Sequence, residues 1–91
     1  MNEYKEIVSR QVRDYGRIEV KLKDQLDRRQ MTRNRLRTLT GVKYDVIDRY
    51  YKGVDIQMVD LDFLAKVCCV FDCQIADLLE YHPPEEYFFS A

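Results

Sequence analysis

The sequence predicts an all-α fold, and three observations support that prediction. Apolar residues recur every three or four positions through most of the chain, which is the period of a helix with one buried face. The three glycines, Gly16, Gly41 and Gly53, fall where this period breaks, and Pro83 and Pro84 stand together near the end. The length of 91 residues supports one domain, because a core of this size suffices when several helices share it.

An amphipathic helix is expected at the start of the chain, outside the main domain. Its stripe within residues 3–15 consists of Tyr4, Ile7, Val8, Gln11, Val12 and Tyr15. After Gly16, apolar and charged residues alternate, which predicts a short strand at Arg17–Lys21 that leads into the next helix. That helix is predicted to run from about Lys21 to Arg29. Its apolar side is formed by Leu22, Leu26 and Met31.

Residues Met31–Gly53 have the pattern of two short helices joined by a turn. Thr32 is suited to cap the first helix, because its hydroxyl can accept a hydrogen bond from a free backbone N–H. Gly41 and Val42 make the turn. The buried face of the second helix is predicted to be Val46, Ile47 and Tyr50. Arginine and lysine lie on the other side, so the segment is a helix-turn-helix pattern that indicates nucleic-acid binding.

The C-terminal half is predicted to hold a loop, two helices and a tail. Residues 53–59 form the loop, and Asp60 is a good N-cap for the next helix. The buried side of that helix is predicted to be Leu61, Leu64, Ala65, Cys68 and Phe71. After a break at 72–74, a final helix ends before Pro83. Its inward residues are Ile75, Leu78 and Leu79. A short strand is expected in the tail, residues 85–91.

Charge is distributed unevenly along the chain, although the net charge is only −1. The first 20 residues are balanced, with four basic and four acidic side chains. Lys21–Lys52 holds ten basic residues against four acidic ones, whereas from Gly53 onward one lysine faces eight carboxylates. One third of the protein therefore attracts a polyanion while the remainder repels it, and this separation would orient docking.

Three stretches together resemble the Cro/repressor-type (Xre-type) helix-turn-helix family over Ile18–Pro84. They are TRNRLRTLTGVKYDVIDRYYKG for the helix pair, DLDFLAKVCCVFDC for the fourth helix and QIADLLEY for the fifth. The resemblance implies a compact five-helix domain at residues 17–84 that binds double-stranded DNA, usually as a two-fold dimer. Residues 1–16 are then an N-terminal extension, and residues 85–91 an aromatic C-terminal tail.

The resemblance implies a recognition helix at about Tyr44–Tyr51 whose first side chains enter the major groove. The positions that it assigns to base contact are Lys43, Tyr44, Asp45 and Arg49. Arg49 has the donors for two hydrogen bonds to guanine, and Asp45 can accept one from the cytosine amino group. The candidates for phosphate contact are Arg33, Asn34 and Lys52. The first two lie at a helix start, where free backbone N–H groups favour an anion.

The sequence departs from the family pattern at Arg37, at Lys43, and at Asp45 and Asp48. Arg37 stands where the family usually has alanine, so either its aliphatic stem packs against the next helix or the two helices lie further apart. Lys43 stands where serine or threonine is common, which removes the expected N-cap hydroxyl.

The acidic and aromatic residues of the second helix also allow a structural interpretation. Asp45 and Asp48 leave Lys43–Lys52 with a net charge of only +1. They can pair with Arg49 or Lys52 within the helix instead of contacting bases. Tyr44 can equally pack at the edge of the helix over Asp48.

No catalytic site, metal site or cofactor is predicted. Cys68, Cys69 and Cys73 with His82 invite a zinc interpretation, but zinc ligands usually come in pairs from loops. We therefore expect reduced thiols that act as small buried side chains. One histidine and no glycine-rich phosphate loop argue against an enzyme. No long apolar run or signal-peptide pattern is present, so we expect no membrane association and a cytoplasmic location.

The leading hypothesis is a small, sequence-specific, DNA-binding transcriptional regulator that forms a homodimer. The predicted dimer or partner surface combines aromatic and aliphatic residues near both ends, because such side chains rarely stay uncovered in a monomer. They are Tyr4, Ile7, Val8, Tyr15, Tyr87, Phe88 and Phe89. The alternative is a protein-interaction module, such as an antitoxin, a phage-encoded inhibitor or an adaptor, that uses the same fold to bind protein.

Overall fold

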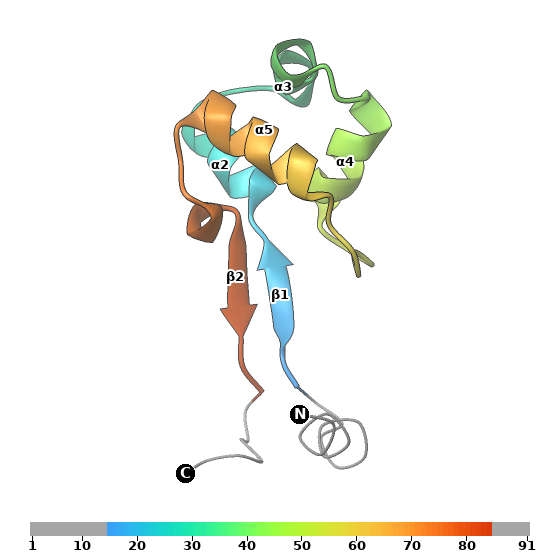
Figure 1. Cartoon of the computed structure of the whole chain (residues 1–91), viewed down its shortest axis with the longest axis vertical. Helices are drawn as coiled ribbons and strands as arrows, with labels where there is room; N and C mark the ends of the chain where they lie inside the picture. Colours follow the sequence, from blue (N-terminus) through green and yellow to red (C-terminus); the bar gives the residue numbers. More distant parts are fainter. Residues whose placement is uncertain (1–14, 85–91) are drawn as a thin grey trace.

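A body of helices with a two-stranded ribbon projecting from it makes up residues 15–84, the part of the chain that the computed structural model describes (Figure 1). The elements in these residues are β1 Arg17–Val20, α2 Leu22–Arg28, α3 Arg33–Thr40, α4 Tyr44–Lys52, α5 Leu61–Phe71, a 3-10 turn η1 Ile75–Asp77, and β2 Leu79–His82. The fold is mostly helical, as predicted. None of the helices in residues 15–84 is long and apolar enough to cross a membrane.

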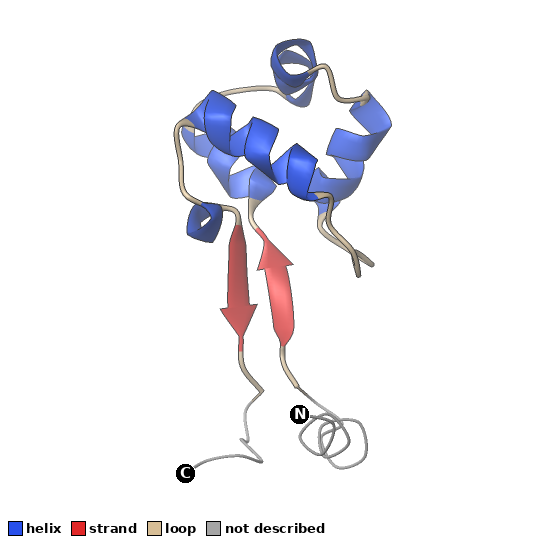
Figure 2. Cartoon of the chain, in the orientation of Figure 1, coloured by secondary structure: helices blue, strands red, loops and turns tan. Residues whose placement is uncertain are grey.

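The ribbon joins the two ends of the described chain. β1 and β2 are antiparallel, with Arg17 opposite His82 and Val20 opposite Leu79. Figure 2 shows the two strands extending side by side from the helices. The predicted strand at Arg17–Lys21 is confirmed, ending one residue earlier. Gly16 precedes it with φ +84°, and a Cβ there would overlap the His82 carbonyl oxygen, so the close approach of the strands requires glycine.

The predicted fifth helix is wrong, and the five-helix count with it: residues 15–84 contain four α-helices. Ile75–Asp77 forms a single 3-10 turn, and the chain then enters β2. The cause is long-range. Leu78 is buried, and its carbonyl accepts a hydrogen bond from the Lys21 N–H at 2.7 Å, after which β2 pairs with β1. Ile75, which was expected to face inward, is half exposed. Pairing of β2 with the distant strand β1 therefore outweighs the short helical spacing of Ile75, Leu78 and Leu79.

The core lies between the four helices and includes the first residue after η1. Its buried members are Leu22, Leu26, Leu36, Ile47, Tyr50, Phe63, Leu64, Val67, Phe71 and Leu78. The rings of Tyr50 and Phe63 stack with centroids 4.3 Å apart, which joins α4 to α5. The Tyr50 hydroxyl accepts a hydrogen bond from the Asp60 N–H at 3.1 Å, so the buried phenol is satisfied.

The buried face of α5 differs from the prediction. Asp60 caps the helix as expected, its side chain accepting from the Asp62 N–H at 2.9 Å. Leu64 and Phe71 are buried and Cys68 is partly buried, but Leu61 is 77% exposed and Ala65 is exposed. Phe63 and Val67 take the inward positions instead. The helix is apolar on more than one side, so its spacing alone admits two stripes, and the packing of Phe63 on Tyr50 selects one.

The remaining predictions divide into those confirmed and those outside the described residues. The predicted helix Lys21–Arg29 is confirmed as α2, with Leu22 and Leu26 buried and Met31 packed against the core. Gly53 ends α4 and opens the predicted connecting loop. The expected helix in residues 3–15 and the expected strand in residues 85–91 fall outside the described part of the chain, except for Tyr15.

Candidate nucleic-acid interface

The helix pair α3–α4 begins with the cap that the sequence predicted. The Thr32 hydroxyl accepts a hydrogen bond from the Arg35 N–H at 3.0 Å, which satisfies one of the free donors at the start of α3. Gly41 ends α3 in the left-handed conformation, with φ +74°, and its N–H donates to the Arg37 carbonyl at 2.9 Å. These two contacts set the length of α3 and the direction of the turn into α4.

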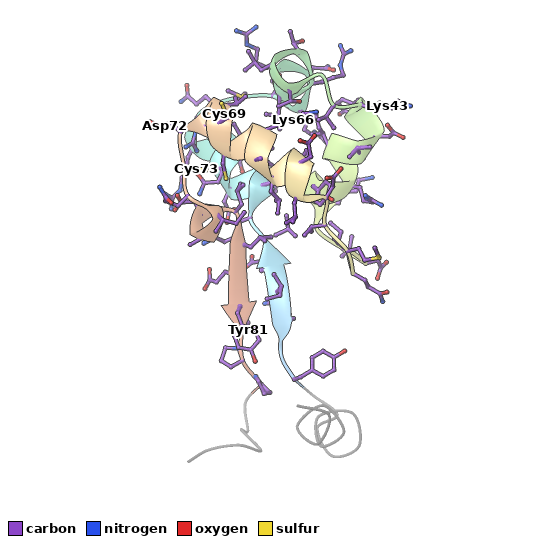
Figure 3. All side chains as sticks on the ribbon, viewed as in Figure 1. Lys43, Lys66, Cys69, Asp72, Cys73 and Tyr81 are labelled. Atoms are coloured by element: carbon purple, nitrogen blue, oxygen red, sulfur yellow. The ribbon has the colours of Figure 1, made fainter. Side chains whose placement is uncertain are left out.

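The second helix of the pair is anchored by its apolar face and open at its start. Ile47 and Tyr50 are buried and Val46 is partly buried, as predicted. Lys43 makes no side-chain cap, which confirms the consequence expected from the absence of a hydroxyl there. The first N–H groups of α4 are therefore not bonded by a capping side chain. In Figure 3, Lys43 lies at the outer end of the helix, pointing away from the body.

The structure places the four predicted base-contact residues on the first two turns of α4 or directly before it. Lys43, Tyr44, Asp45 and Arg49 are all exposed. Arg49 lies with its guanidinium carbon 5.4 Å from the centre of the Tyr50 ring, so its stem follows the helix and its head remains accessible. Asp45 forms no ion pair with any residue in the range 15–84. This surface offers donors and one acceptor within reach of a ligand.

An ion-pair cluster that sequence reasoning missed connects α3 to α4. The Arg33 Nη1 lies 2.5 Å from the Asp48 Oδ1, and the Lys52 Nζ lies 3.1 Å from the other carboxylate oxygen. The Arg33 guanidinium carbon also lies 4.1 Å from the centre of the Tyr51 ring and 5.7 Å from that of Tyr44. Bonds from Lys52 and Arg33 hold the pKa of Asp48 below its ordinary value. The Asp48–Lys52 pair confirms one predicted alternative.

Two of the three phosphate candidates are therefore engaged within the protein. Arg33 and Lys52 both pair with Asp48, while Asn34 is exposed in the first turn of α3. The separation of 15 positions between Arg33 and Asp48 gives no periodic signal. Arg37 is exposed, and the buried contact of α3 is made by Leu36.

One arginine of the basic run has a structural role that the sequence did not reveal. Arg29 Nη1 donates to the side-chain oxygen of Gln25 at 2.6 Å, and Nη2 donates to the Phe71 carbonyl at 3.0 Å. Gln25, a buried polar side chain, in turn donates to the Asp77 carbonyl at 3.1 Å. Arg29 therefore holds the end of α5 and the 3-10 turn against α2, and its charge is partly withdrawn from the surface.

Side chains that could hold a metal gather at one place in the described range, on the ribbon. Ligand atoms of Glu19, Glu80 and His82 lie within 4.8 Å of one another. His82 Nε2 is 2.7 Å from a Glu19 oxygen, and Lys21 Nζ is 3.1 Å from a Glu80 oxygen. The bond to Lys21 holds the pKa of Glu80 below its ordinary value. Each carboxylate already has a cationic or hydrogen-bonding partner, so the group acts as a cross-strand polar network.

The three thiols are free, and in Figure 3 Cys69 and Cys73 lie near the end of α5. Cys68 and Cys73 are partly buried, but Cys69 is exposed, so the expectation that all three are buried is wrong for Cys69. Cys69 falls on the solvent side because the buried face of α5 follows Phe63 and Val67. The pKa of Cys73 is raised to about 11, mainly by burial and to a smaller extent by the neighbouring Cys68. That thiol is therefore protonated at neutral pH and is a poor nucleophile.

The match to known proteins covers the helices just described. Residues 21–84 match the family model of the Cro/C1-type helix-turn-helix DNA-binding domain. The chain belongs to this family. Among solved structures it is similar to the transcriptional regulator VanUg, with 26% sequence identity and a TM-score of 0.61 over 80% of this chain and 95% of that one. No curated protein matches the sequence. The Cro/C1-type domain thus includes α2 to α5, η1 and β2, and α3–α4 is its helix-turn-helix.

Proposed function

We propose that this protein is a small, sequence-specific transcriptional regulator that places α4 in the major groove of double-stranded DNA. The observation that supports this most is the intact reading unit: α3 is capped, Gly41 makes the turn, and Ile47 anchors α4 from behind. The exposed side chains of the first two turns of α4 therefore point away from the core. A helix held in this way is rigid enough to carry side chains to base edges.

Lys43 and Arg49 carry most of the proposed specificity. A guanidinium can donate two hydrogen bonds to guanine O6 and N7, and a lysine ammonium can reach guanine or a phosphate. Asp45 can accept from the cytosine amino group, and Tyr44 can contact a base or a sugar. Asn34 and the free N–H groups at the start of α3 would hold a phosphate and so fix the register of the domain on the duplex.

The ribbon supplies the proposed dimer contact. Tyr15, Ile18 and Tyr81 are more than half exposed, and they border an open apolar groove between the ribbon and the loop around Ile56 and Val59. We propose that a second copy of the chain covers this face. The same interface would include the predicted surface residues of segments 1–16 and 85–91. Of the residues predicted for this surface, Tyr15 is described, and Tyr81 accompanies it by donating to the Tyr15 carbonyl at 2.9 Å.

The alternative function, a module that binds protein, keeps support from one observation. Asp45 and Asp48 reduce the charge of α4, so this helix is less suited to a polyanion than α3 is. A protein partner with a basic surface would find the same face acceptable. DNA binding is favoured because the family is a DNA-binding one and because Lys43 and Arg49 remain exposed.

A matched set of variants tests the proposal. Lys43→Ala and Arg49→Ala should each weaken binding to a selected duplex, whereas Arg17→Ala, which removes the same charge from the ribbon, should leave it nearly unchanged. Losing one two-pronged guanine contact costs about 1–3 kcal/mol of discrimination, or about 5- to 150-fold. Equal effects of Arg49→Ala and Arg17→Ala would show that only total charge matters. Failure of the natural protein to bind any duplex at about 50 mM salt would favour the protein-binding alternative.

A further inference from the structure

A single carboxylate on α4 holds two cations, one from α3 and one from α4. Asp48 bonds to Arg33 with one oxygen and to Lys52 with the other, at 2.5 and 3.1 Å. The carboxylate is largely shielded, with 23% of its side chain exposed, whereas Lys52 is 64% exposed. The net charge of these three groups is therefore +1. Without Asp48, Arg33 and Lys52 would present two unpaired cations.

The guanidinium of Arg33 is held in place by more than this ion pair. Its carbon lies 4.1 Å from the centre of the Tyr51 ring, with the Tyr44 ring 5.7 Å away. Stacking on aromatic rings orients a guanidinium without using its N–H donors. Removal of the Asp48 charge should therefore leave Arg33 between α3 and α4, with its donors available to another anion.

A phosphate is the anion that would compete for the same donors. A planar guanidinium bonds to a carboxylate and to a phosphate through the same fork of N–H groups, so the two anions are alternatives at one site. We propose that Asp48 is an internal counter-anion that withholds Arg33 and Lys52 from DNA phosphates, and that it thereby limits sequence-independent binding. This inference rests on the proposed DNA-binding function, because the competing anion is the DNA backbone.

Asp45 provides a matched control on the same helix. It carries the same charge three positions earlier, it is exposed, and it forms no ion pair with any residue of the described range. Neutralising Asp45 or Asp48 removes the same general repulsion between the protein and DNA. Only neutralising Asp48 also frees two cations, so the difference between the two variants isolates the effect of the ion pairs.

The salt dependence of binding separates these contributions. Each additional phosphate contact makes the slope of log K against log salt steeper by about 0.9. Asp48→Asn should steepen the slope for random duplex by about 0.9 to 1.8, so its loss of affinity between about 50 and 200 mM salt should exceed that of the natural protein by about 3- to 12-fold. Asp45→Asn should raise affinity for random duplex with little change of slope. Asp48→Asn should also reduce the preference for a selected site, because the added contacts read no bases.

Further variants keep the test decisive. Arg33→Gln introduced into Asp48→Asn should reverse about half of the added slope, and Asp48→Glu should behave like the natural protein. If Asp48→Asn does not fold, as judged by circular dichroism, single variants of the natural protein provide the test. Lys52→Gln should then change the salt slope less than Arg49→Gln does, because Lys52 is already paired with Asp48.

Three results would overturn the inference without touching the proposed function. Equal slopes for Asp45→Asn and Asp48→Asn would reduce Asp48 to an ordinary surface charge. Weaker random-duplex binding by a folded Asp48→Asn would mean that Asp48 positions Arg33 for DNA. Equal effects of Lys52→Gln and Arg49→Gln would mean that Lys52 is not withheld. Absence of duplex binding by the natural protein and by every variant would instead refute the proposed function itself.

Discussion

The α3–α4 pair and the β1–β2 ribbon are held together by different kinds of interaction. The ends and the turn of the helix pair depend on neighbours in sequence, because Thr32 caps α3 and Gly41 makes the turn, while Ile47 anchors α4 in the shared core. The ribbon depends on pairing between residues 59 to 65 positions apart, and it carries the polar network of Glu19 and His82. Local contacts therefore set the cap and the turn of the surface proposed for DNA, whereas the ribbon proposed for dimerisation forms only when residues far apart in the sequence meet.

The two regions also differ in how they present charge. Arg33 and Lys52 at the helix pair are compensated by Asp48, whereas Lys43 and Arg49 form no ion pair with any residue in the range 15–84. The ribbon exposes apolar side chains such as Ile18 and Tyr81. One end of the molecule is therefore suited to selective contact with a polyanion, and the other to an apolar partner such as a second copy.

The largest expected effect comes from the anchor of α4. Ile47→Ala removes a fully buried side chain and should lower the free energy of unfolding by about 2–5 kcal/mol. Urea denaturation followed by circular dichroism would measure it. Val54→Ala, at an exposed loop position, is the matched control and should change little. A small loss from Ile47→Ala would show that the helix pair is not held by the core.

Alanine at two glycines compares the regions directly, because both glycines have positive φ. Gly41→Ala meets no atom within 4 Å and should cost about 1–2 kcal/mol for the left-handed conformation alone. Gly16→Ala carries the same strain and also overlaps the His82 carbonyl, so the outer end of the ribbon should open. Hydrogen exchange of the β1 and β2 amides would report this opening. Equal protection of the ribbon in both variants would contradict the close approach at Gly16.

Removal of the α3 cap should have a smaller effect. Thr32→Ala loses the bond to the Arg35 N–H and should cost about 0.5–2 kcal/mol. Thr38→Ala is the matched control, because its hydroxyl bonds only to the Asn34 carbonyl one turn earlier in the helix and caps nothing. Thermal melting of both variants would show whether the first loses more stability than the second.

At neutral pH the smallest effect is expected at Cys73, just after the end of α5, which contributes a pH dependence only at high pH. The pKa of Cys73 is about 11 in the folded protein and 9.0 for an ordinary thiol, so folding favours the protonated form. The stability that this provides is complete below pH 9.0 and is lost as the pH rises toward about 11. In Cys73→Ala the urea midpoint should fall less with rising pH over that interval than in the natural protein. If it falls equally in both proteins, groups other than Cys73 cause the loss of stability.

Local signals in the sequence allowed much of the helix pair to be predicted. Thr32, Gly41 and Asp60 act within a few residues of where they stand, and the structure confirms all three. β2 could not be predicted, because Leu79–His82 becomes a strand only through β1. The inward face of α5 also depended on a distant partner, since Phe63 faces inward to stack on Tyr50.

The candidate site was predictable to a similar extent. The exposure of Arg49 followed from the helical period, which places it opposite Ile47, whereas Lys43 is exposed because it stands just before α4. The engagement of Arg33 by Asp48 did not, because ion pairs between helices leave no regular spacing in the sequence. Residues assigned to phosphate contact by the resemblance can therefore have internal partners that only the folded chain reveals.

Sequence-specific DNA binding can be measured by selecting genomic DNA fragments with the full chain and then comparing equilibrium binding to a recovered duplex and to a scrambled one. The natural protein should prefer the recovered duplex, and Lys43→Ala with Arg49→Ala should remove the preference while the melting temperature is unchanged. Equal binding of the recovered and scrambled duplexes by the natural protein, or no binding of either at about 50 mM salt, would contradict sequence-specific DNA binding.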